Sequence, residues 1–176
     1  MMLLRLIKTR KNAMPVTPLH LGIGACCKAV GQKRFSFMIF AGTQVLMDIE
    51  PLLGLIYGWP YLHIFTHNLI GATLIGSLAF IIGKPISQRV LHTVFKSSDW
   101  MISWKTAAIS AYIGSYSHIF LDAFMHHDVY FFYPLILKNP LQGLVPYSII
   151  FYSCIFSAVL AGLYWFYLNQ RKNKGV

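Results

Sequence analysis

Residues 35–57 read FSFMIFAGTQVLMDIEPLLGLIY, an apolar segment with two acidic residues, Asp48 and Glu50, towards its end. A helix needs about 20 predominantly apolar residues to cross a bilayer, and this segment is long enough. Ionisable side chains inside such a segment are costly and usually serve a function. The segment therefore predicts a membrane-spanning helix that carries two carboxylates near one end.

The composition of the whole chain agrees with a membrane environment. The chain is 56% hydrophobic and only 11% charged, whereas soluble domains carry about 25% charged residues. Its 176 residues correspond to one domain by length. We therefore expect a single integral membrane domain.

Three further apolar segments, at residues 62–83, 104–125 and 145–168, approach or exceed the length that spans a bilayer. A shorter apolar segment, residues 19–30, is too short to cross by itself. Residues 1–14 are basic and amphipathic, as is typical of a segment that lies on a membrane surface. The expected fold class is all-α, an integral membrane bundle of four long transmembrane helices and one short N-terminal helix.

Lysine and arginine residues gather at the ends of these segments. Because cytoplasmic loops are enriched in these residues, the turn at residues 28–34, the loop at 84–105 and the C-terminal tail are predicted to be cytoplasmic. The basic residues from Arg5 to Lys11 would then lie on the outer side, or the short helix re-enters the membrane. The net charge of +10 does not indicate nucleic-acid binding, because no basic face interleaved with aromatic residues is present.

Polar residues from four segments are predicted to lie at one depth. With a rise of about 1.5 Å per residue, they lie roughly 20–26 Å from the basic residues at the cytoplasmic ends of their helices. In a hydrocarbon layer about 30 Å thick, this depth falls in the outer half. The residues compared are His20, Asp48, His67 and His118. The sequence therefore predicts that these residues form one site.

His63 and His67 are predicted to lie on one face of a helix, because residues four apart share a face. His118 and Asp122 repeat this spacing. Imidazole and carboxylate groups are ligands of Zn²⁺ and similar divalent ions. Each pair alone would also fit an interior hydrogen bond, so the common depth favours a metal site. The expected ligands are His20, Asp48, His63, His67, His118 and Asp122, and the expected metal is zinc.

Three residues beside these ligands, Glu50, His126 and Asp128, are candidates for a general base. The acids at 48 and 50 taken alone would also fit a solvated helix end. Asp48, however, shares a helix face with Gln44, which we expect to hydrogen-bond to a ligand. His92 lies in the basic loop and is expected to be an ordinary exposed residue.

Four stretches of the chain, taken in order, resemble the motifs of a known family. They are His20, Asp-Ile-Glu-Pro at 48–51, His-Ile-Phe-Thr-His-Asn at 63–68 and Gly-Ser-Tyr-Ser-His-Ile-Phe-Leu-Asp at 114–122. They look like those of the membrane-bound metal-dependent hydrolases of bacterial inner membranes, the YdjM-type family. Glu50 stands where that family has a second Asp, and Asn68 where it has Ser.

The YdjM-type family is distantly similar to zinc-dependent phospholipase C. The resemblance therefore implies an all-helical enzyme of the bacterial inner membrane that holds clustered zinc ions and hydrolyses phosphoester bonds.

The favoured hypothesis is a membrane-embedded metal-dependent hydrolase that acts on a lipid or lipid-linked substrate from the outer half of the membrane. Six expected ligands exceed the three or four that one zinc ion takes from a protein, so two or more ions are expected. A divalent-cation transporter or channel is the alternative, because histidines and carboxylates inside spans also mark ion pathways. A bis-histidine haem site is a third reading. The pattern predicts no oligomeric state.

Overall fold

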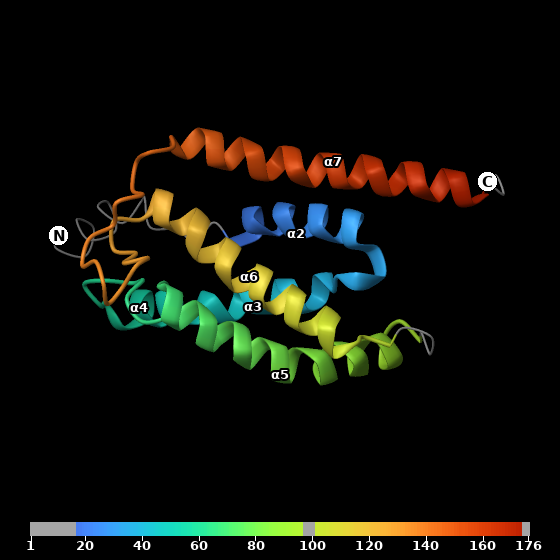
Figure 1. Cartoon of the computed structure of the whole chain (residues 1–176), viewed down its shortest axis with the longest axis horizontal. Coiled ribbons are helices and arrows are strands. Elements are labelled where there is room, and N and C mark those ends of the chain that lie inside the picture. The colour runs from blue at the N-terminus through green and yellow to red at the C-terminus, as the bar shows by residue number, and fades with distance from the viewer. Residues whose placement is uncertain (1–16, 97–100, 174–176) are drawn as a thin grey trace.

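The computed structural model describes residues 17–96 and 101–173. The predicted surface segment at residues 1–14 lies outside the described residues. In chain order the elements are α2 (Thr17–Gly31), the 3₁₀ turn η1 (Gln32–Arg34), α3 (Phe37–Met47), α4 (Ile49–Tyr57), α5 (Leu69–Thr93), α6 (Trp104–Met125) and α7 (Tyr147–Asn173). This part of the chain contains helices and loops without a strand, which confirms the all-α prediction (Figure 1).

Local signals set several helix ends. The Ser36 side chain accepts a hydrogen bond from the Ile39 amide at the start of α3, and the Ser103 side chain accepts one from the Thr106 amide at the start of α6. Such caps satisfy amide groups that have no partner inside the helix. Helix α4 ends at Gly58, whose φ of 74° lies in the left-handed region that favours glycine. With its cap at Ser103, α6 spans Trp104–Met125, which are the bounds predicted for this segment.

One predicted helix is wrong at its start. Residues 62–68, predicted to begin the second long span, form a non-helical segment, and α5 begins only at Leu69. Asn68 is the cap of α5, since its Oδ1 accepts the Gly71 amide at 2.8 Å. At its other end α5 continues through Pro85 to Thr93, ten residues beyond the predicted residue 83. The histidine pair at 63 and 67 therefore does not lie on a helix face.

Three helical stretches are long and apolar enough to cross a membrane: Phe37–Tyr57, which comprises α3 and α4, Leu69–Thr93 and Tyr147–Arg171. Large apolar side chains point outward from them, and Phe156 and Leu163 of α7 are each 62% exposed. Soluble proteins rarely expose apolar patches of this extent. These faces fit contact with lipid.

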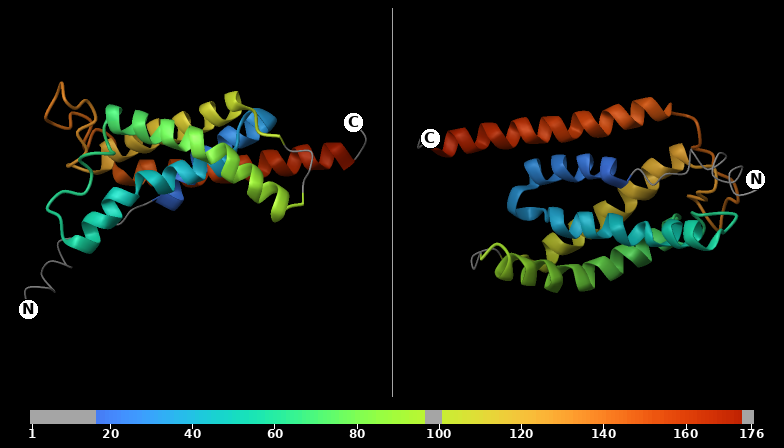
Figure 2. Two further views of the ribbon diagram at one scale, coloured as in Figure 1. Left: turned by 90° about the horizontal axis from the view of Figure 1, so that it is seen from below. Right: turned by 180° about the vertical axis from the view of Figure 1, so that it is seen from behind.

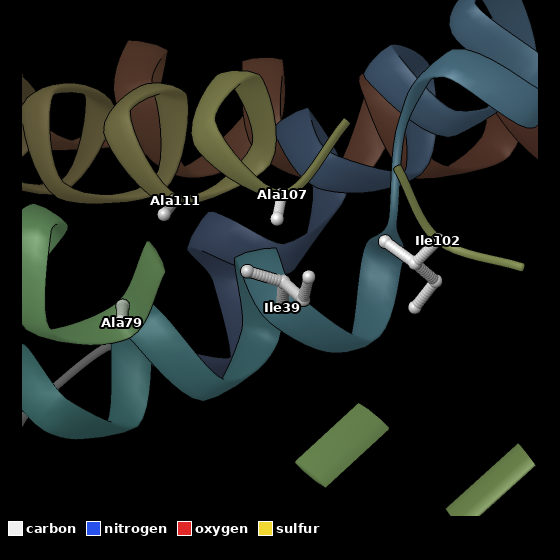
Figure 3. Packing of buried hydrophobic residues seen from close by; sticks show 5 residues of the cluster. All are labelled: Ile39, Ala79, Ile102, Ala107 and Ala111. Carbon is white, nitrogen blue, oxygen red and sulfur yellow. The ribbon is translucent and has the colours of Figure 1, made fainter. Parts of the chain in front are cut away.

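Helix α6 lies at the centre of the bundle and is not among those three stretches. It packs against both α3 and α5, and α2 joins this group to α7 (Figures 1 and 2). Small residues permit the close approach, because a Cβ on Gly114 would lie 2.9 Å from the Cβ of Thr43. Figure 3 shows Ala107 and Ala111 of α6 facing Ile39 of α3 and Ala79 of α5 in a buried apolar cluster.

The two ends of the bundle differ in character. The turn between α2 and α3, the end of α5 and the end of α7 lie at one end, and the loops at residues 58–68 and 126–146 lie at the other (Figure 1). The first group carries Lys33, Arg34, Arg89 and Arg171. The segments that the charge pattern assigns to one side of a membrane therefore gather at one end, which we term the basic end.

Candidate metal centre

The predicted ligands converge at the end of the bundle opposite the basic end. His20 comes from α2, Asp48 from the junction of α3 and α4, and His118 and Asp122 from α6. The non-helical segment 62–68 supplies His63 and His67. All six predicted ligands are buried except Asp48, whose side chain is 18% exposed. The prediction that one depth means one site therefore agrees with the structure.

Asp122 is the centre of this cluster. Its Oδ2 lies 3.3 Å from His67 Nε2 and 3.2 Å from His118 Nε2. Its Oδ1 faces the other way, 3.6 Å from His20 Nε2 and 4.0 Å from His126 Nε2. One oxygen of Asp122 therefore faces His67 and His118, and the other faces His20 and His126.

The orientation of His118 is fixed by Gln44. The Gln44 Nε2 amide donates to the Gly114 carbonyl at 3.0 Å, so Gln44 Oε1, 2.6 Å from His118 Nδ1, is an acceptor. His118 Nδ1–H must therefore be the donor. In the neutral ring Nε2 then carries a lone pair, and it points at Asp122 and at Asp48 Oδ1, 3.4 Å away. Gln44 therefore makes the predicted hydrogen bond to one of the candidate ligands.

A hydroxyl orients His67 in the same way. The Thr66 hydroxyl donates to Glu50 Oε2 at 2.6 Å, so it accepts from His67 Nδ1–H at 2.8 Å. The lone pair of neutral His67 then lies on Nε2, which is 3.2 Å from His118 Nε2. Two lone pairs that face each other at this distance repel unless a cation or a proton lies between them. This contact is the clearest sign of a cation site in the cluster.

The ring of His63 is oriented by a hydrogen bond from its Nδ1 to Asp128. His63 Nδ1–H donates to Asp128 Oδ1 at 3.0 Å, and the Leu62 amide donates to Oδ2 at 2.8 Å. Burial raises the pKa of the Asp128 carboxyl, but the hydrogen bond from His63 and the Leu62 amide outweigh it and hold the pKa below its usual range. Asp128 is therefore ionised and fixes the His63 ring, as carboxylates do for histidines that bind metal.

His20 supplies an independent sign of a ligand. Its Nε2 is buried and has no hydrogen-bond partner in the described part of the chain. A buried polar atom without a partner costs free energy, so such atoms are rare in native proteins. A divalent ion beside Asp122 would give this nitrogen a partner, and the donor set of the cluster therefore fits a metal.

Glu50, a candidate general base, accepts hydrogen bonds on both of its carboxylate oxygens. Its carboxylate accepts the amides of Ile64, Phe65 and Thr66 at 3.1, 2.8 and 2.6 Å, and the Thr66 hydroxyl as well. Both oxygens are engaged, and Glu50 thereby holds the segment 62–68 against α4. The structure gives Glu50 an anchoring position beside the cluster, with Oε2 3.8 Å from His67 Nδ1.

Of the three base candidates, His126 has the most open position. Its ring stacks on that of His63 with centroids 4.5 Å apart, and its Nε2 faces Asp122. Burial lowers the pKa of His126, so the ring is neutral at neutral pH. Asp128, like Glu50, has both oxygens occupied by donors. His127 and His92 are exposed, the latter as predicted.

The number of donors exceeds the needs of one ion. Four sets of three ligand atoms lie within 4.8 Å of one another: His20, His118 and Asp122; Asp48, His67 and His118; His63, His67 and Asp122; and His63, His126 and Asp128. A single zinc ion takes three or four protein ligands. The cluster therefore offers donors for more than one ion, and Asp122 belongs to two of the four sets.

Sequence reasoning missed the parts played by Thr66 and the segment around it. Asn68, directly before the apolar residues from Leu69, is an N-cap residue type that would have placed the beginning of α5 correctly. The hydroxyl of Thr66, by contrast, has no signal in the sequence, because its importance comes from the carboxylate of Glu50, which reaches it from α4.

The fold and the cluster define an all-helical protein with apolar helices of membrane-spanning length and a buried histidine–carboxylate centre. The chain belongs to the family of a domain of unknown function, DUF4184, whose model matches residues 51–175. The matched region contains His63, His67, His118 and Asp122, and it begins just after Asp48 and Glu50. No curated protein and no solved structure matches the chain.

Proposed function

We propose that this protein is a membrane-embedded metal-dependent hydrolase that cleaves phosphoester bonds of a lipid or lipid-linked substrate. The observation that supports it most is the approach of His67 Nε2 to His118 Nε2, since both rings direct lone pairs to one point beside Asp122. The resemblance to the YdjM-type hydrolases supports the reaction class, and the buried donor set supports the metal.

The ligands are divided between two positions in this proposal. His67 and His118, with Asp48 beside His118, lie on the Oδ2 side of Asp122, whereas His20 lies on the Oδ1 side. Imidazole and carboxylate donors favour Zn²⁺. When bound, such an ion polarises a phosphoryl oxygen and lowers the pKa of a water molecule towards about 7.

The residues of the chain then have distinct tasks. Gln44, Thr66 and Asp128 hold the protons on Nδ1 of three histidines and so keep each Nε2 aimed inward. His126, neutral and close to Asp122, is the proposed general base. Glu50 positions His67 through Thr66.

We propose that α6 is a fourth transmembrane helix, which packs its buried face against α3 and α5 and turns the exposed stripe Ile109, Ile113, Tyr116 and Phe120 towards lipid. Its polar residues then have protein partners: Ser110 Oγ donates to the Thr106 carbonyl at 2.7 Å and accepts the Ser36 amide at 2.8 Å. The substrate in this proposal is a membrane lipid or a lipid-linked headgroup.

A divalent-cation transporter or channel would need polar groups between the cluster and the basic end. That region of the bundle holds apolar residues such as Ile39, Ala79 and Ala111 (Figure 3). Its buried polar residues are hydroxyls such as that of Ser110, and the buried acids and imidazoles of the described residues all lie at the cluster. Thr43, which is also buried there, donates its hydroxyl to the Ile39 carbonyl at 2.8 Å. This packing favours the hydrolase over the transporter, and zinc flux into proteoliposomes would reverse that ranking.

Hydrolysis by the purified protein tests the proposal. We expect zinc in the protein and cleavage of phospholipid phosphoesters in mixed micelles, and we expect cleavage to fall to background after chelation and to return with zinc. His118→Ala should lose the activity, whereas His92→Ala, at an exposed histidine near the basic end, should keep it. Full hydrolysis in a chelator would refute a metal-dependent reaction.

The side of the membrane on which the site opens follows from the charge distribution. Because the basic end is predicted to be cytoplasmic, the cluster should face the outer half of the membrane. In a variant whose three cysteines are replaced by alanine, Lys138→Cys should react with an impermeant maleimide in intact cells and Lys96→Cys should not. Both lysines are exposed, at opposite ends of the bundle. Labelling of Lys96→Cys alone would reverse the orientation and leave the metal centre unchanged.

A further inference from the structure

A cavity of about 720 Å³ lies between α2 and α7 at the basic end, far along the bundle from the metal centre. Ala25 and Ala29 of α2 line it on one side, and Ala158, Ala161 and Gly162 of α7 line it on the other. Trp165 of α7 lies at its border and is 64% exposed. The cavity is therefore an apolar groove between two helices.

The space between the two helices changes along their length. At Gly22 they touch, since a Cβ there would collide with the Cys154 carbonyl. At Gly162, two turns further along α7, a Cβ would meet nothing within 4 Å. Small side chains on both helices leave the space between them unfilled. The two helices run side by side in both views of the bundle (Figures 1 and 2).

The mouth of the groove is positively charged. Lys28, Lys33 and Arg171 line it, and none of the described residues that line it is acidic. Lys28 Nζ donates to the carbonyls of Gln32 and Phe35 at 2.8 and 2.9 Å, which holds its charge at the turn. The described acidic residues, Asp48, Glu50, Asp122 and Asp128, belong to the metal centre and its surroundings. Lys33 and Arg171 therefore place positive charge at the mouth of the groove without an acidic lining residue beside them.

We propose that this groove binds one anionic phospholipid of the leaflet at the basic end. The phosphate lies at Lys33 and Arg171, and an acyl chain lies along the alanine and glycine surfaces of α2 and α7. Basic pockets between membrane helices on the cytoplasmic side bind anionic headgroups in this way. Trp165, exposed at the border of the groove, is a residue type that is enriched at the headgroup region. This site is independent of the hydrolase proposal and of the metal.

Binding of dioleoylphosphatidylglycerol to the full-length protein in detergent, followed by native mass spectrometry, tests the proposal. We expect one molecule to bind before any other, and dioleoylphosphatidylcholine to bind at least about tenfold more weakly. The double variant K33Q/R171Q should weaken this first binding step by about tenfold or more, because each basic residue contributes near an anionic headgroup. Gly162→Leu should weaken it as well, because the new side chain fills the apolar part without changing the charge.

The matched control is R89Q/K96Q, which removes the same charge from exposed positions of the basic end outside the groove. It should leave the first binding step unchanged, and millimolar inorganic phosphate should not displace the lipid. An equal loss in the control, equal binding of both lipids, or unchanged binding in both Gly162→Leu and K33Q/R171Q would overturn the proposal. Displacement by phosphate would assign the groove to a free anion.

Discussion

Replacing Asp122 with asparagine is expected to empty the metal centre. Asn has nearly the same shape but carries no charge, and its amide would direct hydrogens at imidazole nitrogens that now approach a carboxylate. Because the two oxygens of Asp122 face the two sets of histidines, both ion positions lose a ligand at once. Hydrolysis should fall by more than about 100-fold, the upper range for loss of an outer partner alone.

Elemental analysis measures the zinc content of purified variants. Three variants with different expected zinc contents separate the two ion positions. Asp122→Asn should contain little or no zinc. His20→Ala should lose only the ion on the Oδ1 side and keep the other, since His20 faces that oxygen alone. His92→Ala should contain as much zinc as the unaltered protein. Full zinc content in a folded Asp122→Asn protein would contradict the central position given to this carboxylate.

Removal of the metal is expected to destabilise the whole bundle, and this is the second large effect. The cluster joins α2, α3, α6 and the segment 62–68 through buried charges and lone pairs, which would be left without a counter-ion. A ligand at about 1,000 times its Kd stabilises the folded state by about 4 kcal/mol. The midpoint of thermal unfolding in detergent should therefore fall by several degrees on chelation and recover with zinc.

The same measurement on Asp122→Asn separates metal binding from other actions of the chelator. If the stabilisation comes from ions held by Asp122, chelation should leave the melting temperature of this variant unchanged. A chelator that lowered it equally in both proteins would show that the effect has another origin. A melting temperature of the unaltered protein that did not respond to chelation would contradict a structural contribution of the metal.

Most of the helical stretches could be predicted from the sequence because each is a long, mainly apolar local pattern. Residues 104–125 form α6 with the predicted bounds, and the basic segments gather at one end as their distribution indicates. The convergence of His20, Asp48 and His118 was predictable too, because the rise of a helix is constant. Hydropathy therefore indicates how long each segment is and how deep in the membrane its residues lie.

The segment 62–68 could not be predicted in this way. The spacing of His63 and His67 fits a helix, and only Asn68, at the end of the segment, signals that a helix starts after it. The decisive contact comes from Glu50, whose carboxylate gathers three successive amides of a segment 14 to 16 residues further along the chain. A contact of this kind forms only in the folded protein, so the sequence contains no periodic pattern that predicts it. The predicted ligands came together, although the backbone that presents two of them is irregular.

The modest hydropathy of α6 bears on how the protein is made. A membrane insertion machinery passes each segment to the lipid according to its own apolarity, and a segment with a His, an Asp and several hydroxyl groups is a poor candidate when presented alone. Helices α3 and α5 precede it in the chain and offer it protein surfaces. We therefore expect α6 to enter the bilayer last among the three, as the partner of helices already in place, so that the metal centre is completed by a late step of biogenesis.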